Sequence, residues 1–271
     1  MAGCSFIHLG LVAVLASGCG NKSDETDAGP SDPDCLMDAG DLFSSISTDV
    51  SDAVPTVVEV TWTTTEPNIG WVEFGVGGDL SMSTDADEVE TTEHSFLLLG
   101  LLPSSEVSVR VMGTQNGASV CAADIAVETG PLDPALTEMT LAELDATQLA
   151  GGYTVIPLTS EDTGYVVILD EQGRAVWFYE TQRGIFRARL SMDREAVVVN
   201  YQAGNQDNEG SIRRISLDGN EVTDLFVPGI HTDFIEIADE RYASLAWTIE
   251  AVQDGDDERK FLGDLIIEIE S

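Results

Sequence analysis

Basic residues are scarce in this sequence of 271 residues. It contains 12 Lys and Arg against 49 Asp and Glu, which gives a formal net charge of −37. Its only lysines are Lys22 and Lys260. A protein that binds the phosphates of DNA or RNA needs clustered basic side chains, so we expect no nucleic-acid partner. An anionic membrane surface would repel the chain in the same way.

Long hydrophobic runs are also absent, because no stretch reaches the ~18 consecutive apolar residues of a membrane-spanning helix. The most apolar segment covers residues 6–15 at the N-terminus, and its length and position predict a signal peptide over residues 1–18. Hydrophobic residues still make up 43% of the chain. The sequence can therefore bury a core, and its length suggests one or two domains.

Small residues followed by a cysteine, Ala16-Ser17-Gly18-Cys19, end the apolar segment. This pattern resembles the lipobox of bacterial lipoproteins, although no Lys or Arg precedes the segment. The resemblance implies cleavage before Cys19 and lipidation of that cysteine. It places the chain in the bacterial cell envelope, lipid-anchored at the outer membrane or cell surface, with the periplasmic side as an alternative. The competing interpretation is a cytosolic chain with a buried N-terminal helix.

Residues 19–42 are rich in Asp, Gly, Pro and Ser and show no apolar periodicity. Such a composition predicts an acidic tether without a core of its own. The aspartates lack the spacing and the closing glutamate of a calcium loop, so no metal site is predicted here.

Cysteine is rare as well, and beyond Cys19 the chain carries only Cys35 and Cys121. An isolated pair in an oxidising compartment is more often bridged than free, so we predict a disulfide between them. Two buried free cysteines are the alternative.

Short segments of strand length follow one another between residues 43 and 129. Apolar residues alternate or run together over residues 57–63, 71–74, 95–99 and 107–111, and turn residues separate these segments. The pattern predicts an antiparallel β-sandwich.

The same segment resembles a fibronectin type III module. Val60-Thr61-Trp62 supplies the core tryptophan, and Leu101-Leu102-Pro103 leads into the strand that follows. Val107 departs from the family, which usually has a tyrosine there. His94 is expected at a surface or sheet edge, because no second His or Cys stands nearby to complete a metal-ligand set.

Residues 130–150 contain Gly130-Pro131 and Pro134, which break regular structure. They predict a linker with one short helical turn.

An internal repeat organises residues 151–271. Copies begin at Gly164, Gly210 and Gly263, and each predicts a strand that leads to a tight Asp/Gly turn and a second strand, although the third stops before its turn. Two further strand-like runs, residues 194–201 and 242–247, give about four strands per repeat, which is typical of a propeller blade.

The predicted fold class is therefore all-β, with a fibronectin type III-like sandwich followed by an incomplete β-propeller of about two and a half blades. Because so few blades cannot close a ring, we expect the sequence to be part of a longer propeller.

The repeat region resembles the arylsulfotransferase family, whose secreted propellers move a sulfuryl group from a phenolic sulfate donor to a phenol acceptor. Four groups of residues carry the resemblance: residues 167–179, Arg213-Arg214-Ile215-Ser216 with Asp218-Gly219, His231-Thr232-Asp233-Phe234, and residues 264–269. It implies no cofactor, and it places His231 in the central channel.

Sulfuryl transfer develops negative charge on the transferred group and on the phenolate that leaves, so it requires several imidazole or cationic groups. One histidine cannot fill every role, and the family's nucleophilic histidine belongs to later blades. The resemblance therefore implies a transferase that is inactive as this chain alone. In the alternative interpretation, His231 is a loop histidine bonded to a carboxylate such as Asp233.

Two other functions compete with this one: a surface-anchored binding module, and a fragment of a quinoprotein-like propeller dehydrogenase. The acidic run over residues 254–258 is expected to be a solvated loop rather than a calcium site.

We predict that the exported protein is cleaved before Cys19 and lipid-anchored, because the apolar segment ends in a lipobox-like pattern. Intact-mass spectrometry of membrane fractions should find an N-terminus at a diacylated Cys19, and Cys19→Ser should abolish the lipid mass. A protein with an intact Met1 in the cytosol would contradict this prediction.

Overall fold

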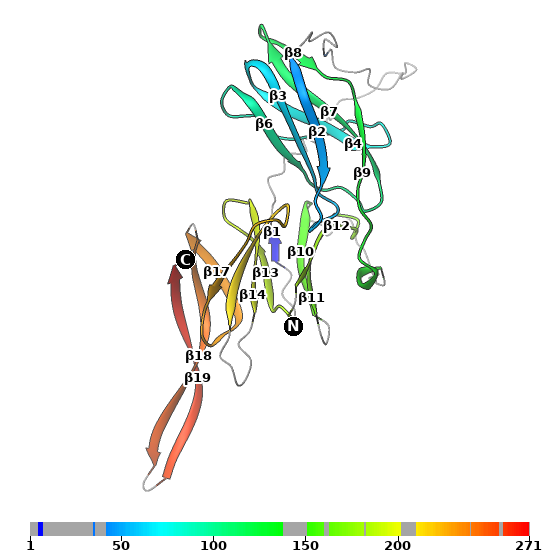
Figure 1. Cartoon of the computed structure of the whole chain (residues 1–271). Helices are drawn as coiled ribbons and strands as arrows, with labels where there is room; N and C mark the ends of the chain where they lie inside the picture. The colour runs from blue at the N-terminus through cyan, green and yellow to red at the C-terminus, as the bar shows by residue number, and fades with distance from the viewer. Residues whose placement is uncertain are drawn as a thin grey trace, which may run out of the picture. The chain divides into compact units, whose positions relative to one another are not determined.

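The computed structural model describes residues 5–7, 35, 42–137, 151–159, 163–181, 183–201, 210–238, 240–254 and 257–270. Within these ranges the chain is all-β, as predicted, with one 3-10 helix, η1 (Pro134–Leu136), as its sole helical element (Figure 1). Most of the predicted signal peptide, Cys19 and nearly all of the tether lie outside the described residues.

Contacts between Cα atoms divide the chain into two compact units. Unit 1 comprises Met1–Leu9, Ser51–Val57 and Leu132–Ser271, and unit 2 comprises Gly10–Val50 and Val58–Pro131.

Unit 2 consists of two antiparallel sheets that share one core. The first sheet has the order β2-β3-β6, with β2 (Phe43–Val50), β3 (Val58–Asn68) and β6 (Thr91–Leu98). The second has the order β5-β4-β7-β8, and β9 also pairs with β7; its strands are β4 (Gly70–Val76), β5 (Met82–Ser83), β7 (Glu106–Gln115), β8 (Ala118–Cys121) and β9 (Ile125–Glu128).

Strict alternation along β3 explains why this strand lies on a core. Val58, Val60 and Trp62 are buried, and the residues between them face outward. They pack against Phe74 and the valines of β4 and β7 in the opposite sheet. Burying a valine or larger apolar side chain contributes about 1.5–3 kcal/mol, so this face holds the two sheets together.

His94 was expected at a surface or a sheet edge, and the structure places it at an edge but not on the surface. It lies in β6, which is an edge strand, but its side chain is buried and stacks on Trp62 with ring centroids 4.6 Å apart. Its Nδ1 lies 2.6 Å from Oδ2 of Asp87, and that oxygen also accepts a hydrogen bond from the backbone N–H of Gly70. The buried imidazole is compatible with the core because these polar partners replace water.

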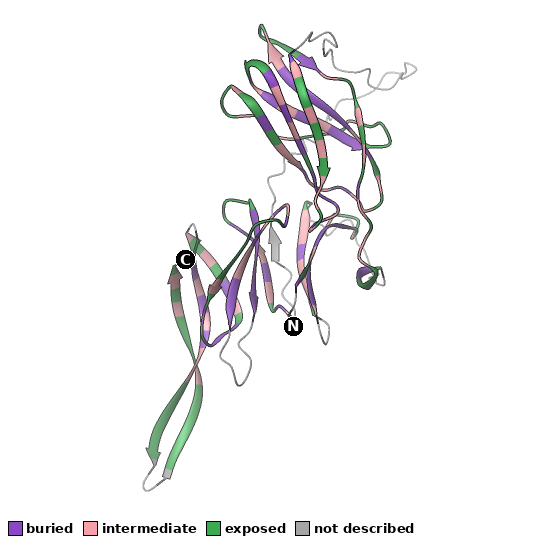
Figure 2. Ribbon diagram, in the orientation of Figure 1, coloured by how far each residue is buried: buried purple, intermediate pink, exposed green. Residues whose placement is uncertain are grey.

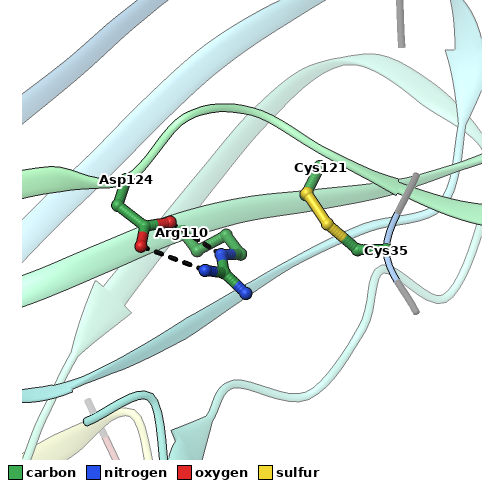
Figure 3. The surroundings of a disulfide bond; sticks show 4 residues. All are labelled: Cys35, Arg110, Cys121 and Asp124. Carbon is green, nitrogen blue, oxygen red and sulfur yellow. Dashed lines mark hydrogen bonds and ion pairs between the residues drawn. A yellow bond between two sulfur atoms is a disulfide. The ribbon is translucent and has the colours of Figure 1, made fainter. Parts of the chain in front are cut away.

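Cys35 and Cys121 form a disulfide, in agreement with the predicted pairing, and their Cα atoms are 5.8 Å apart (Figure 3). Cys121 ends β8, so the bridge attaches the segment before the first sandwich strand to the second sheet. Nearby, Arg110 of β7 donates two hydrogen bonds to the carboxylate of Asp124.

Unit 1 contains three consecutive antiparallel sheets. Sheet 1 has the order β1-β10-β11-β12, with β1 (Ser5–Ile7), β10 (Tyr153–Thr159), β11 (Gly164–Leu169) and β12 (Ala175–Thr181). Sheet 2 has the order β13-β14-β15-β16, with β13 (Arg187–Leu190), β14 (Ala196–Tyr201), β15 (Ser211–Ser216) and β16 (Val222–Phe226). Sheet 3 has the order β17-β18-β19, with β17 (Ile230–Ala238), β18 (Arg241–Asp254) and β19 (Asp257–Glu270).

The first two copies of the repeat fold as predicted. Tight turns join β11 to β12 and β15 to β16, and both have a glycine, Gly173 and Gly219, at a φ of 75°. That left-handed conformation favours glycine because a Cβ would meet the backbone. In the third copy, Gly263 does not start a strand but lies in the middle of β19, opposite Thr248.

Sheet 2 lies between two other layers, because every residue of β14 is buried (Figure 2). Val198 and Ile212 on one of its faces pack against Phe234 of sheet 3. Toward sheet 1, the indole N–H of Trp177 donates a 2.7 Å hydrogen bond to the carbonyl oxygen of Leu217. The uninterrupted apolar run of β14 is thus a strand buried on both faces.

Strands β18 and β19 form a hairpin whose distal half is exposed (Figure 2). It carries large apolar side chains in the open, among them Leu262 (69% exposed) and Ile266 (81% exposed). Both strands extend into the acidic run that was predicted to be a loop, since β18 ends at Asp254 and β19 begins at Asp257.

The linker prediction is met by η1 as far as the structure describes it. Asp133 caps this 3-10 turn by accepting a hydrogen bond from the backbone N–H of Ala135, and Leu136 is buried against Tyr165 of sheet 1. Residues 138–150 of the predicted linker lie outside the described residues.

We predict that loss of the disulfide lowers the free energy of unfolding by about 4 kcal/mol, because the bridge closes a long loop in the unfolded chain. Cys35 and Cys121 are 86 positions apart in the sequence. Thermal unfolding with and without dithiothreitol should show a lower melting temperature for the reduced form, and Cys121→Ser should reproduce it without reductant. Equal melting temperatures, or two thiols that alkylate in the native protein, would disprove the bridge.

Candidate functional site

His231 lies in β17, the first strand of sheet 3, and its side chain is buried. The pairing of β17 with β18 passes from His231 opposite Leu245 directly to Phe234 opposite Ser244. Thr232 and Asp233 therefore form a β-bulge. Bulges commonly redirect side chains at functional sites. Here the side chain of Asp233 contacts sheet 2, whereas that of His231 contacts residues of sheet 3.

Two arginines from sheet 2 hold the carboxylate of Asp233. Arg187 of β13 donates hydrogen bonds of 2.8 and 2.9 Å to its two oxygens, and Arg189 donates a third of 3.3 Å. Arg189 also donates to the carbonyl oxygen of Phe234, and the hydroxyl of Ser244 donates to the carbonyl oxygen of Asp233. The bulge is therefore bonded on both its side-chain and backbone oxygens.

The hydrogen bonds from Arg187 lower the pKa of Asp233 to about 2, and desolvation of the carboxylate opposes this shift. Asp233 is therefore ionised at neutral pH. In the alternative interpretation His231 contacts a carboxylate such as Asp233. The arginines bind Asp233, and the carboxylate next to His231 is that of Asp264.

The imidazole of His231 has three close neighbours. Its ring stacks on Trp247 of β18, with centroids 5.1 Å apart and planes inclined by 20°. Its Nδ1 lies 2.6 Å from the hydroxyl oxygen of Thr232. Its Nε2 lies 3.2 Å from Oδ1 of Asp264 in β19, a close electrostatic contact outside hydrogen-bond alignment. The carboxylate of Asp264, the imidazole of His231 and the hydroxyl of Thr232 thus form a chain of contacts within sheet 3.

A second cluster, in sheet 2 and the segment that precedes it, was not predicted from the sequence. The guanidinium groups of Arg183 and Arg213 lie over the ring of Tyr201, 4.8 and 5.1 Å from its centroid. Arg213 also donates two 2.7 Å hydrogen bonds to Asp224, which raise the pKa of Arg213 and lower that of Asp224. The sequence pattern gave no signal for this cluster, because Tyr201 and Arg213 meet only when β14 pairs with β15 and Arg183 comes from the segment before β13.

A small pocket of about 190 Å³ lies where sheets 2 and 3 meet. It is lined by Ile212, Arg214, Thr223, Asp224, Leu225, Glu240 and Tyr242. Burial, with a further contribution from Glu236, raises the pKa of Tyr242 to about 12. The phenol therefore stays protonated at neutral pH and can donate but not act as a base.

No group of three or more His, Cys, Asp or Glu side chains within the described ranges is placed to hold a metal ion. In the same part of the chain, no helix is long and apolar enough to cross a membrane. The lipidation site predicted at Cys19 lies outside the described residues.

Comparison with protein-family models and with curated proteins finds no match for this chain.

We predict that Asp233→Asn destabilises unit 1 by about 1 kcal/mol at pH 7, a value that allows for solvent screening of a half-exposed ion pair. Because the folded pKa lies below the unfolded value of about 3.9, the contribution is present above pH ~4 and is lost as the pH falls toward 2. Urea unfolding of both proteins at several pH values measures it. The difference between them should shrink below pH 4, and a constant difference would contradict the role assigned to the carboxylate.

Proposed function

We propose that the chain is an exported, lipid-anchored bacterial protein of the arylsulfotransferase type, in which a fibronectin type III-like sandwich precedes propeller blades. In this proposal Cys19 carries the lipid, and unit 1 supplies blades that face a phenolic sulfate donor and a phenol acceptor. His231 contributes to the pocket of the transferred sulfuryl group.

One observation carries the proposal: the sequence repeat corresponds to successive sheets of the same construction. Sheet 2 has four strands. The repeat region supplies three strands to sheet 1, and β1 of the predicted signal peptide pairs beside them. In both sheets the Asp/Gly turn lies between the last two strands, and sheet 3 continues the series. Strand β10 of sheet 1 contacts β13, the first strand of sheet 2, and β13 contacts β17, the first strand of sheet 3. Such a succession around one side is what blades of a propeller require, and none of the sheets in the described ranges closes on itself.

The chain supplies only some of the groups that sulfuryl transfer needs. Negative charge develops on the transferred group, so hydrogen-bond donors and cations must converge on it. His231 is the single histidine of residues 132–271, and Arg187 and Arg189 beside it are bonded to Asp233. We infer that this chain binds part of the donor but lacks enough charge-stabilising groups for turnover.

The proposal is tested by the coding DNA beyond the codon for Ser271. Further repeats of the same pattern that contain histidines and arginines would support it. Repeated tryptophan-containing quinone-docking motifs would instead favour a quinoprotein-like dehydrogenase, and a stop codon at that position would favour a surface-anchored binding module.

We predict that the purified chain does not turn over aryl sulfates. The assay is release of p-nitrophenol from p-nitrophenyl sulfate in the presence of a phenol acceptor, with His231→Ala as the matched control. Both proteins should stay at the rate of buffer. Turnover by the unsubstituted chain that His231→Ala abolishes would show that these sheets suffice, and would overturn the inferred inactivity.

A further inference from the structure

The backbone of Thr232 is strained. Its φ is +57°, a left-handed conformation that is unfavourable for a residue branched at Cβ. Conformations of this kind persist where surrounding contacts impose them, and they gather at functional sites. Here the imposing contacts are the hydrogen bonds of Arg187 and Arg189 to Asp233, the next residue in the bulge.

In this conformation Thr232 is exposed to solvent, and its hydroxyl also contacts the buried imidazole of His231. Thr232 is exposed, whereas the side chain of His231 is only 8% exposed under the ring of Trp247. With the ring proton of His231 on Nε2, which faces Asp264, Nδ1 is an acceptor, and the hydroxyl of Thr232 donates to it over 2.6 Å. A hydroxyl, a base and a carboxylate that stabilises the protonated base form the minimal set for nucleophilic catalysis.

We propose that Thr232 is a nucleophile that accepts an acyl group from neutral, activated aryl esters. Its oxygen attacks the ester carbonyl carbon, a new oxygen–carbon bond forms, and the bond from that carbon to the aryl oxygen breaks. The hydroxyl proton passes to Nδ1 of His231 and from there to the departing phenolate. The products are an O-acylated Thr232 and a phenol, with no change of oxidation state.

The charges around the site select the substrate class. Asp264 lies 3.2 Å from Nε2 of His231. Asp233 is paired with Arg187 and Arg189, and the chain carries a net charge of −37. A neutral aryl ester meets no electrostatic repulsion from these carboxylates, so the proposal takes this class as the acyl donor. The acylation therefore goes beyond the sulfuryl transfer proposed above and does not rest on it.

The roles within the site follow from the contacts. Thr232 forms the covalent bond and His231 accepts its proton. Asp264 is a positioning residue, because it acts through the imidazole and lies on the neighbouring strand β19.

The test uses the whole chain and p-nitrophenyl acetate. We expect a burst of up to one equivalent of p-nitrophenol, with the acetyl group mapped to Thr232 by peptide mass spectrometry. Thr232→Ser should keep the labelling. His231→Gln should slow it by about 100-fold, in line with the loss of a general base. Asp264→Asn should slow it by about tenfold, and Asp264→Glu should restore most of the rate.

Thr232→Gly separates catalysis from folding. Glycine adopts a positive φ without strain, so this variant should unfold at a higher temperature than the unsubstituted chain and yet take up no acetyl group at this position. The matched control is Thr154→Ala, which changes a half-buried strand threonine of β10 whose cross-strand partner in β11 is Leu169. It should label as the unsubstituted chain does.

Two results would overturn the proposal. One is a folded, unsubstituted chain that carries no acetyl group on Thr232. The other is labelling of Thr232 that His231→Gln leaves unchanged, since the hydroxyl would then react without its base.

Discussion

The ion pair between Asp233 and the arginines of β13 is the interaction on which the candidate site depends. It connects sheet 2 to sheet 3, and it bonds the bulge at which β17 changes its pairing with β18. The same bulge turns Asp233 toward sheet 2 and leaves His231 toward Trp247 and Asp264. Without the arginines, only the backbone N–H of Phe234 would remain as a hydrogen-bond donor to this carboxylate among the bonds described, beside a strained Thr232.

Because acidic residues greatly outnumber basic ones, each arginine can neutralise only a few of the carboxylates, and its position decides which. Arg110, Arg174 and Arg214 each bond to a nearby aspartate, and Arg213 does so while lying over Tyr201. Self-repulsion of a chain with a net charge of −37 opposes compaction, so pairs that neutralise carboxylates at strand and sheet junctions reduce this penalty where the chain is densest. The exposed end of the β18–β19 hairpin, by contrast, keeps a mixture of acidic and apolar side chains in the open.

The two units are stabilised in different ways. In unit 2 the Cys35–Cys121 bridge and the Trp62 core restrict a small sandwich. In unit 1 the apolar strand β14 is covered on both faces, so stability there depends on stacking one sheet on the next. A repeat that cannot bury its apolar faces alone is stabilised by its neighbours.

Much of the fold could be predicted from the sequence because its signals are local. Alternation in β3, the Asp/Gly turns at Gly173 and Gly219, and the apolar run of β14 each specify a strand or a turn within a few residues. The pairing of Cys35 with Cys121 followed from their number alone. Strand β13 alternates over only four residues and a bulge interrupts β17, so neither was predicted as a strand.

What the sequence alone determined is thus the all-β class and much of the succession of strands and turns. Only the tertiary structure decided which partners meet. His94 is buried against Trp62 rather than exposed, Asp233 binds arginines rather than His231, and His231 lies between Thr232 and Asp264. The physical reason is that side-chain partners come from strands and sheets far apart in the chain, and stacking and register set those distances.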